Sequence, residues 1–206
     1  MLRASITFTV VLSFMILMFP AHGSQPLHAQ QPHGPRVHPI LPQIPRGRDV
    51  AAREAVHDAR REVALARTMF GDAIDYDRAR IVRAKWWPFQ PVGIAMAPTG
   101  NIHFHPRSEN YRDDFSQAPL PLQGLFIHEM THVWQAQRHG RFYLPLMRHP
   151  FCRYTYALRE DWPLARYGLE QQAEIMRHIF LSRRGVVLPG KENLAALERQ
   201  LPFRKA

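Results

Sequence analysis

The chain of 206 residues carries a formal net charge of +10, and 46% of its residues are hydrophobic. This composition excludes an intrinsically disordered chain and indicates a globular protein that is long enough to bury a sizeable core. The basic residues are scattered and no aromatic-basic module is present, so we expect no specific nucleic-acid partner. The charge is compatible with a generally cationic surface or with attraction to a membrane surface, an envelope polymer or nucleic acid.

Residues 1–23 have the pattern of an export signal. Arg3 precedes an apolar run over residues 6–19, and a small-x-small pattern permits cleavage before Ser24. The run is short for a stable membrane span. We therefore predict a signal peptide and an exported protein, either periplasmic or secreted. The alternative is an uncleaved membrane anchor, which would be the only predicted contact with a membrane.

Residues 24–48 are rich in proline, which predicts an extended linker. We expect a single domain over residues 49–206. Its first element is predicted to be a helix over residues 50–70, because helix formers follow an N-capping residue and Gly71 offers a stop.

Strand-forming residues follow this helix, beginning with a β-like stretch over residues 79–82. Apolar triplets at residues 94–96 and 102–104 flank the turn sequence of residues 98–101, which predicts a hairpin. Adjacent residues of a strand point to opposite faces, so a Trp pair there cannot form a flat sugar-binding platform. Three tryptophans are instead expected in the core: Trp86, Trp87 and Trp134.

Two longer helices are predicted in the second half of the chain. One covers residues 122–139 and ends at Gly140, and the other covers residues 163–185 with basic residues in its last turn. A short helix over residues 192–199 follows.

His128, Glu129 and His132 form an HExxH motif in the first of these two helices. Residues four apart share one helical face, so both imidazoles can bind the same ion. Glu129 projects about 100° away, where its carboxylate can act as general base toward a water activated by zinc. A chance match has a probability of ~3% at this composition, and two structural histidines on an amphipathic helix are the alternative.

A catalytic zinc site takes three protein ligands and keeps one position open. Cys152, the single cysteine, excludes an internal disulfide and has no cysteine partner at metal-ligand spacing. No third histidine follows the motif at the spacing of the three-histidine sites. We therefore expect a carboxylate from a later helix, and that helix offers Glu170 and Glu174, one turn apart on one face.

HEMTHVWQ and the downstream EQQAE resemble the motifs of gluzincin metallopeptidases, in which a Glu of an ExxxD-like motif completes the zinc site. This resemblance implies that Glu170 is the third ligand and that Glu174 supports a ligand histidine. Because Glu174 stands where Asp is usual, the two roles can be exchanged.

Together with PTGNIHF, the same segments are similar to bacterial zincin-like proteins described as Vgr-related or Rhs-associated, over about residues 75–185. The resemblance implies an α+β, zincin-like fold. In that fold a small antiparallel sheet or hairpin packs on the active-site helix and on a second, ligand-bearing helix.

A tyrosine or histidine commonly stabilises the developing oxyanion in such sites. The segment between the two helices offers Tyr154, Tyr156 and Tyr167, of which we choose Tyr156 as a catalytic residue beside Glu129. Gln135, one turn past His132, is either a hydrogen-bonding partner near the site or a solvated side chain.

These residues predict an exported, Zn2+-dependent metallohydrolase. Its expected activity is that of a peptidase that cleaves a peptide or protein substrate with Glu129 as general base. Two alternatives remain open: a zincin-like module that holds zinc without turnover, and an envelope or secretion-associated effector. No oligomeric state is predicted.

Overall fold

The computed structural model describes residues 36–39, 50–147, 152–159, 162–191, 194–199 and 201–203. The predicted signal peptide lies outside these residues, and so does the predicted linker apart from its residues 36–39. In the part of the chain that the structure describes, no helix has both the length and the apolar character needed to cross a membrane.

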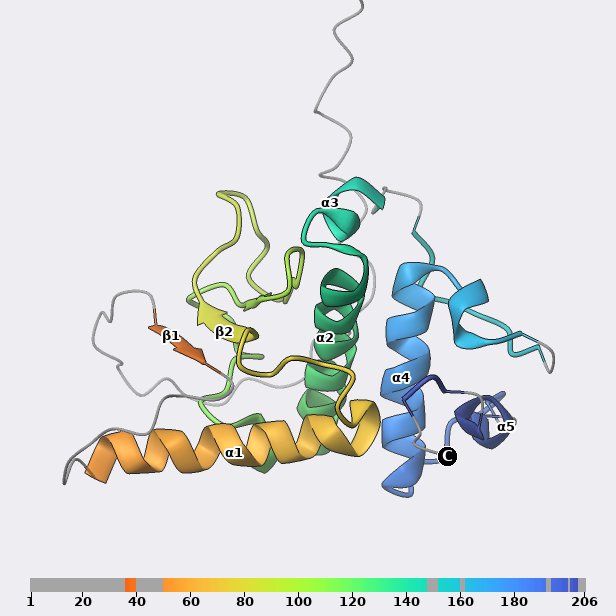
Figure 1. Cartoon of the computed structure of the whole chain (residues 1–206), viewed down its shortest axis with the longest axis horizontal. Coiled ribbons are helices and arrows are strands. Elements are labelled where there is room, and N and C mark those ends of the chain that lie inside the picture. The colour runs from red at the N-terminus through yellow and green to blue at the C-terminus, as the bar shows by residue number, and fades with distance from the viewer. Residues whose placement is uncertain are drawn as a thin grey trace, which may run out of the picture.

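The described elements comprise five α-helices, three short strands and two single-turn 3-10 helices (Figure 1). In chain order they are β1 (Arg36–Pro39), α1 (Val50–Phe70), β2 (Arg80–Arg83), β3 (Ile102–His103), η2 (Phe115–Gln117), α2 (Leu120–His139), α3 (Tyr143–Met147), η3 (Leu164–Arg166), α4 (Leu169–Arg183) and α5 (Leu194–Arg199).

The helices form the framework that positions the site. In Figure 1, α1 runs across the base of the molecule, and α2 and α4 stand beside each other above it. The predicted bounds of α1 are confirmed, since it ends at Phe70 and Gly71 takes the left-handed φ of 54° that terminates it. The helix predicted over residues 122–139 is confirmed as α2, which begins two residues earlier.

The helix predicted to begin at residue 163 is wrong at its N-terminal end. Leu164–Arg166 form only a 3-10 turn, and α4 begins at Leu169. Tyr167 and Gly168 are extended between the two, and the side chain of Gln171 accepts a hydrogen bond from the Gly168 N–H at 3.0 Å. Proline at a possible helix start therefore opens a turn here instead of the helix.

The strands form a small mixed sheet in the order β1-β2-β3. β1 pairs antiparallel with β2, and β2 pairs parallel with β3, with Ile81 opposite Ile102. The predicted hairpin is reduced to one antiparallel bridge between Met96 and His103, with N···O distances of 3.0 and 2.7 Å. Gly100 turns the chain between them with φ of 89°.

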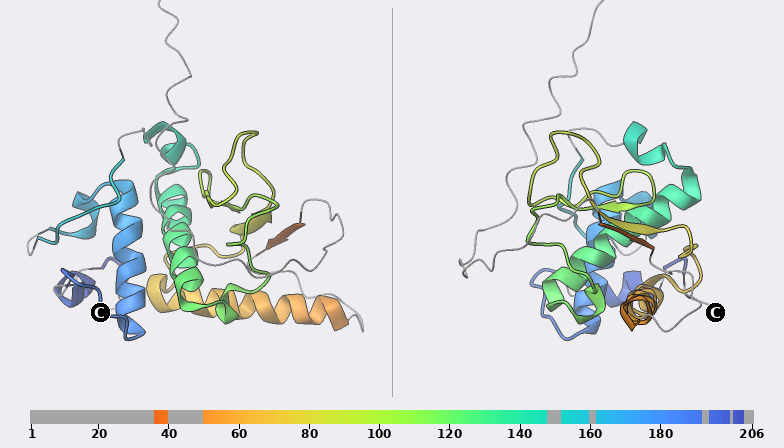
Figure 2. Two further views of the ribbon diagram at one scale, coloured as in Figure 1. Left: turned by 180° about the vertical axis from the view of Figure 1, so that it is seen from behind. Right: turned by 90° about the vertical axis from the view of Figure 1, so that its left-hand side faces the viewer.

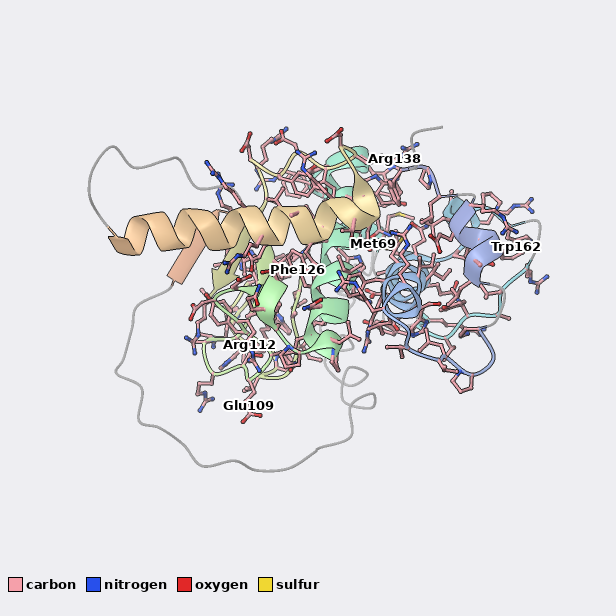
Figure 3. All side chains as sticks on the ribbon, turned by 90° about the horizontal axis from the view of Figure 1, so that it is seen from below. Met69, Glu109, Arg112, Phe126, Arg138 and Trp162 are labelled. Carbon is pink, nitrogen blue, oxygen red and sulfur yellow. The ribbon has the colours of Figure 1, made fainter. Side chains whose placement is uncertain are left out.

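The core lies between α1, the sheet, α2 and α4. Phe104, Phe115 and Phe126 form a stack with ring centroids 5.4 Å apart at each step. Figure 3 shows side chains filling the space between the helices, with Phe126 and Met69 among them. The expectation that all three tryptophans lie in the core is wrong for Trp86, which is 41% exposed beyond the end of β2. Trp87 is half-buried, and Trp134 is buried.

Candidate metal centre

His128 and His132 lie on the same face of α2, one helical turn apart, as their spacing predicts. Both side chains are buried, and their ring centroids are 5.0 Å apart. Glu170, in the first turn of α4, faces them from the neighbouring helix. Its Oε2 atom lies 3.2 Å from His132 Nε2 and 3.4 Å from His128 Nε2.

These three side chains could hold a metal ion, because one donor atom from each lies within 4.8 Å of the other two. Two ligand atoms bound to a tetrahedral zinc at about 2.1 Å are roughly 3.4 Å apart. The contacts of Glu170 with the two imidazoles have this length. Two histidines and one carboxylate are also a donor set that suits zinc.

The Nδ1 atom of His132, which is the ring nitrogen that does not face Glu170, contacts Gln135, and Gln172 in turn holds Gln135. Gln135 Oε1 lies 2.8 Å from His132 Nδ1, and Gln135 Nε2 donates to the backbone oxygen of Leu169 and to Gln172 Oε1. Gln172 Nε2 in turn donates to the backbone oxygen of Tyr167 at 2.7 Å.

The direction of these hydrogen bonds fixes the tautomer of His132. A backbone carbonyl can only accept, so the amide nitrogens of Gln135 and Gln172 must point toward Leu169 and Tyr167. Gln135 Oε1 therefore accepts from a proton on His132 Nδ1. His132 Nε2, on the other side of the ring, lies 3.2 Å from Glu170 Oε2.

The outer nitrogen of His128 has a different partner, since Nδ1 lies 2.9 Å from Glu174 Oε1. Burial alone would lower the pKa of His128, but the hydrogen bonds to Glu170 and Glu174 outweigh burial and raise the pKa to about 9. Burial would likewise raise the pKa of Glu174, yet the His128 contact lowers it to about 2, with Arg177 and His178 adding to the effect.

Glu129 is also buried beside the histidines, and its charge contributes to the raised pKa of His128. Its Oε2 atom is shielded from solvent and has no hydrogen-bond partner among the residues with described side chains. A buried carboxylate oxygen without a partner is rare in folded proteins.

The structure places the three candidate tyrosines differently, and the buried Tyr167 accepts a hydrogen bond from the backbone N–H of Arg159. The Tyr154 ring stacks on the His128 ring, with centroids 6.2 Å apart and an interplanar angle of 14°. The Tyr156 hydroxyl is buried and lies 2.6 Å from His178 Nδ1, so Tyr156 reaches His128 only through His178 and Glu174. Tyr154 therefore lies closer than Tyr156 to the predicted metal ligands.

Sequence reasoning missed Gln172 and left Gln135 undecided between a site partner and a solvated residue. Gln135 is 1% exposed, which assigns it to the site. Its position one turn after His132 was the available signal. Gln172 carried none, because its contact with Gln135 spans 37 positions of the sequence.

The chain matches no protein-family model. It is 39% identical over 146 residues to the type VI secretion system spike protein VgrG2b of Pseudomonas aeruginosa, an alignment that covers 66% of this chain and 14% of that protein. The chain therefore spans about one seventh of the length of this curated relative. It is also similar to the solved effector domain of Pseudomonas aeruginosa VgrG2b, with a TM-score of 0.56 and 31% identity. That match covers 78% of this chain and 87% of the solved domain. The chain belongs to the family of the VgrG2b effector domain.

Proposed function

We propose that this effector domain is a zinc-dependent hydrolase that cleaves a peptide or amide bond. The observation that carries the proposal is the arrangement of His128, His132 and Glu170, in which two imidazole nitrogens and a carboxylate oxygen converge in a buried site. The contact of Gln135 with His132 Nδ1 supports the proposal, because it holds the ring with Nε2 directed toward the same point.

His128 Nε2, His132 Nε2 and Glu170 would hold the ion. Zinc, when bound, polarises a carbonyl and makes a water nucleophilic at neutral pH. Glu174 and Gln135 orient the two imidazoles through their outer nitrogens, which keeps the ligand atoms aligned without rotation of the rings.

Glu129 would carry the proton in this reaction. Its partnerless Oε2 can accept a proton from the attacking water and pass it to the leaving amine. Tyr154, whose ring lies against His128, is better placed than Tyr156 to bind the developing oxyanion. Tyr156, predicted as catalytic, would act through His178 as a positioning residue.

The test compares Glu129→Gln and His132→Ala with the unmodified chain. The zinc content is measured by mass spectrometry, and the hydrolysis is followed with quenched fluorescent casein as a general probe. Glu129→Gln should keep about one zinc per chain and lose activity by roughly 10²- to 10⁴-fold. His132→Ala should lose both the zinc and the activity. Glu109→Gln, an exposed carboxylate of another loop, serves as the matched control.

Equal turnover by Glu129→Gln and the unmodified chain would contradict the role of Glu129, and a purified chain without zinc affinity would contradict the site itself. A zinc-loaded chain that leaves casein and a peptide library intact would favour the alternative of a module that holds zinc without turnover.

A further inference from the structure

Two groups of large apolar side chains are exposed, on separate segments. The loop cluster, after β2, consists of Trp86, Phe89 and Val92, and Phe89 is 68% exposed. The α3 cluster consists of Phe142, Leu146 and Met147, and Leu146 is 81% exposed. Single exposed apolar residues are common on protein surfaces, but groups of three that include aromatic rings mark interaction sites.

The loop that carries the first cluster is held rigidly by a buried polar residue. Gln90 is 3% exposed, and its Nε2 donates to the backbone oxygens of Ile94 and His103 at 2.9 and 3.0 Å. Its Oε1 accepts from the backbone N–H of Trp86 at 2.8 Å. These bonds fix both ends of the loop on the sheet and hold the backbone that carries the aromatic side chains. Their exposure is therefore part of the folded structure.

The two clusters lie toward the same end of the molecule. In Figure 1 the yellow-green loop after β2 rises above the sheet, and α3 lies at the same height beyond the end of α2. The views of Figure 2 are turned about the vertical axis, and both segments keep this position in each of them. A flat surface that approaches this end can therefore meet both clusters.

Cations lie at both clusters: Lys85 Nζ donates to the backbone oxygen of Pro88 in the loop, and Arg141 lies beside Phe142. Residues 78–108, which contain the loop cluster, include five Lys or Arg and no Asp or Glu. Residues 130–159, which contain the α3 cluster, include five Arg and likewise no acidic residue. The Arg141 guanidinium lies over the Phe142 ring, 5.0 Å from its centroid. Aromatic side chains surrounded by cations complement the interface of a bilayer that carries anionic headgroups.

We propose that this end of the molecule docks on an anionic lipid bilayer, with the loop cluster and the α3 cluster inserted at the headgroup level. The apolar side chains would leave water for the acyl boundary, and the flanking Lys and Arg would pair with the headgroups. This docking is independent of zinc and of hydrolysis. A bilayer fits better than an acidic protein partner because the two clusters project from separate segments and do not line a shared groove.

The experiment uses the full chain with Cys152→Ser and a single new cysteine that carries an environment-sensitive fluorophore. Phe89→Cys reports on the loop cluster and Leu146→Cys on the α3 cluster. Val187→Cys, between α4 and α5, is the matched control, because Val187 is 86% exposed and apolar but lies outside both clusters. Each protein is mixed with vesicles of phosphatidylcholine alone or with vesicles that also contain about 30 mol% phosphatidylglycerol. This fraction is on the order of the anionic lipid content of a cell membrane. The label reports which surface of the domain contacts the lipid. Binding through the predicted apolar segment at residues 6–19 would therefore not produce a response confined to positions 89 and 146.

We expect the emission at positions 89 and 146 to rise at least about twofold with the anionic vesicles and less with the neutral ones, while position 187 stays unchanged. An equal response at all three positions, or none at 89 and 146, would overturn the proposal. A rise at positions 89 and 146 that occurs without vesicles and increases with protein concentration would also overturn the proposal. It would identify a second copy of the chain as the partner of this surface. Chelation of zinc should leave the response unchanged.

Discussion

The two histidines of the candidate centre occupy equivalent positions on α2, yet their outer nitrogens meet different chemistry. His128 Nδ1 faces the carboxylate of Glu174, whereas His132 Nδ1 faces the neutral amide of Gln135. A carboxylate stabilises a protonated imidazole much more strongly than an amide does. His128 is therefore the ligand at which protons compete most with the metal. Its pKa is raised to about 9, so its imidazole is protonated at neutral pH when no metal is bound.

The affinity of the site for zinc should depend on pH. Below pH 9 the metal-free chain carries a proton on His128 that zinc must displace, so zinc binding releases a proton and the zinc affinity rises with pH. Between pH 6 and 9 we expect a rise of up to about tenfold per pH unit, levelling off as the pH passes the pKa of His128. Competition with a chromophoric chelator at several pH values measures this slope.

Glu174→Gln removes the carboxylate that raises the pKa of His128. The variant should bind zinc roughly 10- to 100-fold more weakly at high pH, and its affinity should level off at a lower pH than that of the unmodified chain. Glu109→Gln is the control and should change neither quantity. An unchanged pH profile in Glu174→Gln would show that Glu174 does not set the basicity of His128.

The parts of this site that can be predicted from the sequence are those whose residues lie close together along the chain. His128, Glu129 and His132 lie within one helical turn, so spacing alone brings them together. Glu170 required a resemblance to a known family, since it comes from another helix. The stacking of Tyr154 on His128 depends on an irregular segment without periodicity, and no local pattern could have distinguished it from Tyr156.

At the scale of elements, α2 and α4 approach each other closely at Gly124. A Cβ atom at this position would lie 3.3 Å from Leu181 Cδ2 and 3.4 Å from Arg177 Cγ. A glycine inside a helix is destabilising by roughly 0.5–1 kcal/mol relative to alanine. The close contact between the two helices explains why a glycine is nevertheless compatible with this place. The same contact sets the spacing between the histidines on α2 and Glu170 on α4.

Gly124→Val should therefore separate the two helices. We expect the free energy of unfolding to fall by about 1–3 kcal/mol, and the zinc affinity to fall as well, because Glu170 moves away from the histidines. Urea unfolding and chelator competition measure the two effects. Gly93→Val is the control, since a Cβ at Gly93 meets nothing within 4 Å. If Gly124→Val binds zinc as tightly as the unmodified chain, the helix contact does not set the geometry of the site.

The elements themselves were predictable to the extent that their signals are local. α1 carries a run of helix formers, both α1 and α2 end at a glycine, and their predicted C-terminal ends agree with the structure. The parallel pairing of Ile81 with Ile102 joins residues far apart in the chain, and a strand of two residues has no pattern of its own. The exposure of Trp86 escaped prediction for a related reason, since it depends on the buried side chain of Gln90 four residues later.

At the scale of the whole molecule, the candidate centre joins two parts of the fold. α2 packs on α1 and the sheet through the stack of phenylalanines, whereas α4 packs on α5 at the other side. The buried carboxyl group of Glu170 lies between α2 and α4 beside the two histidines, and the carboxyl group of Glu129 is buried on α2. An ion bound by both helices would offset the electrostatic cost of burying these groups and would tie the two parts together.

Removal of zinc should therefore destabilise the entire fold and not the site alone. A ligand at 100 to 1,000 times its dissociation constant stabilises the folded state by about 2.7–4.1 kcal/mol, which corresponds to a shift of the thermal midpoint of roughly 5–15 °C for a chain of this size. Calorimetry with and without a chelator measures the shift. In His132→Ala, which lacks one ligand, the chelator should have no effect, and this variant separates loss of the ion from any direct action of the chelator. A chain that loses its zinc at an unchanged midpoint would show that α2 and α4 are held together by their side-chain packing alone.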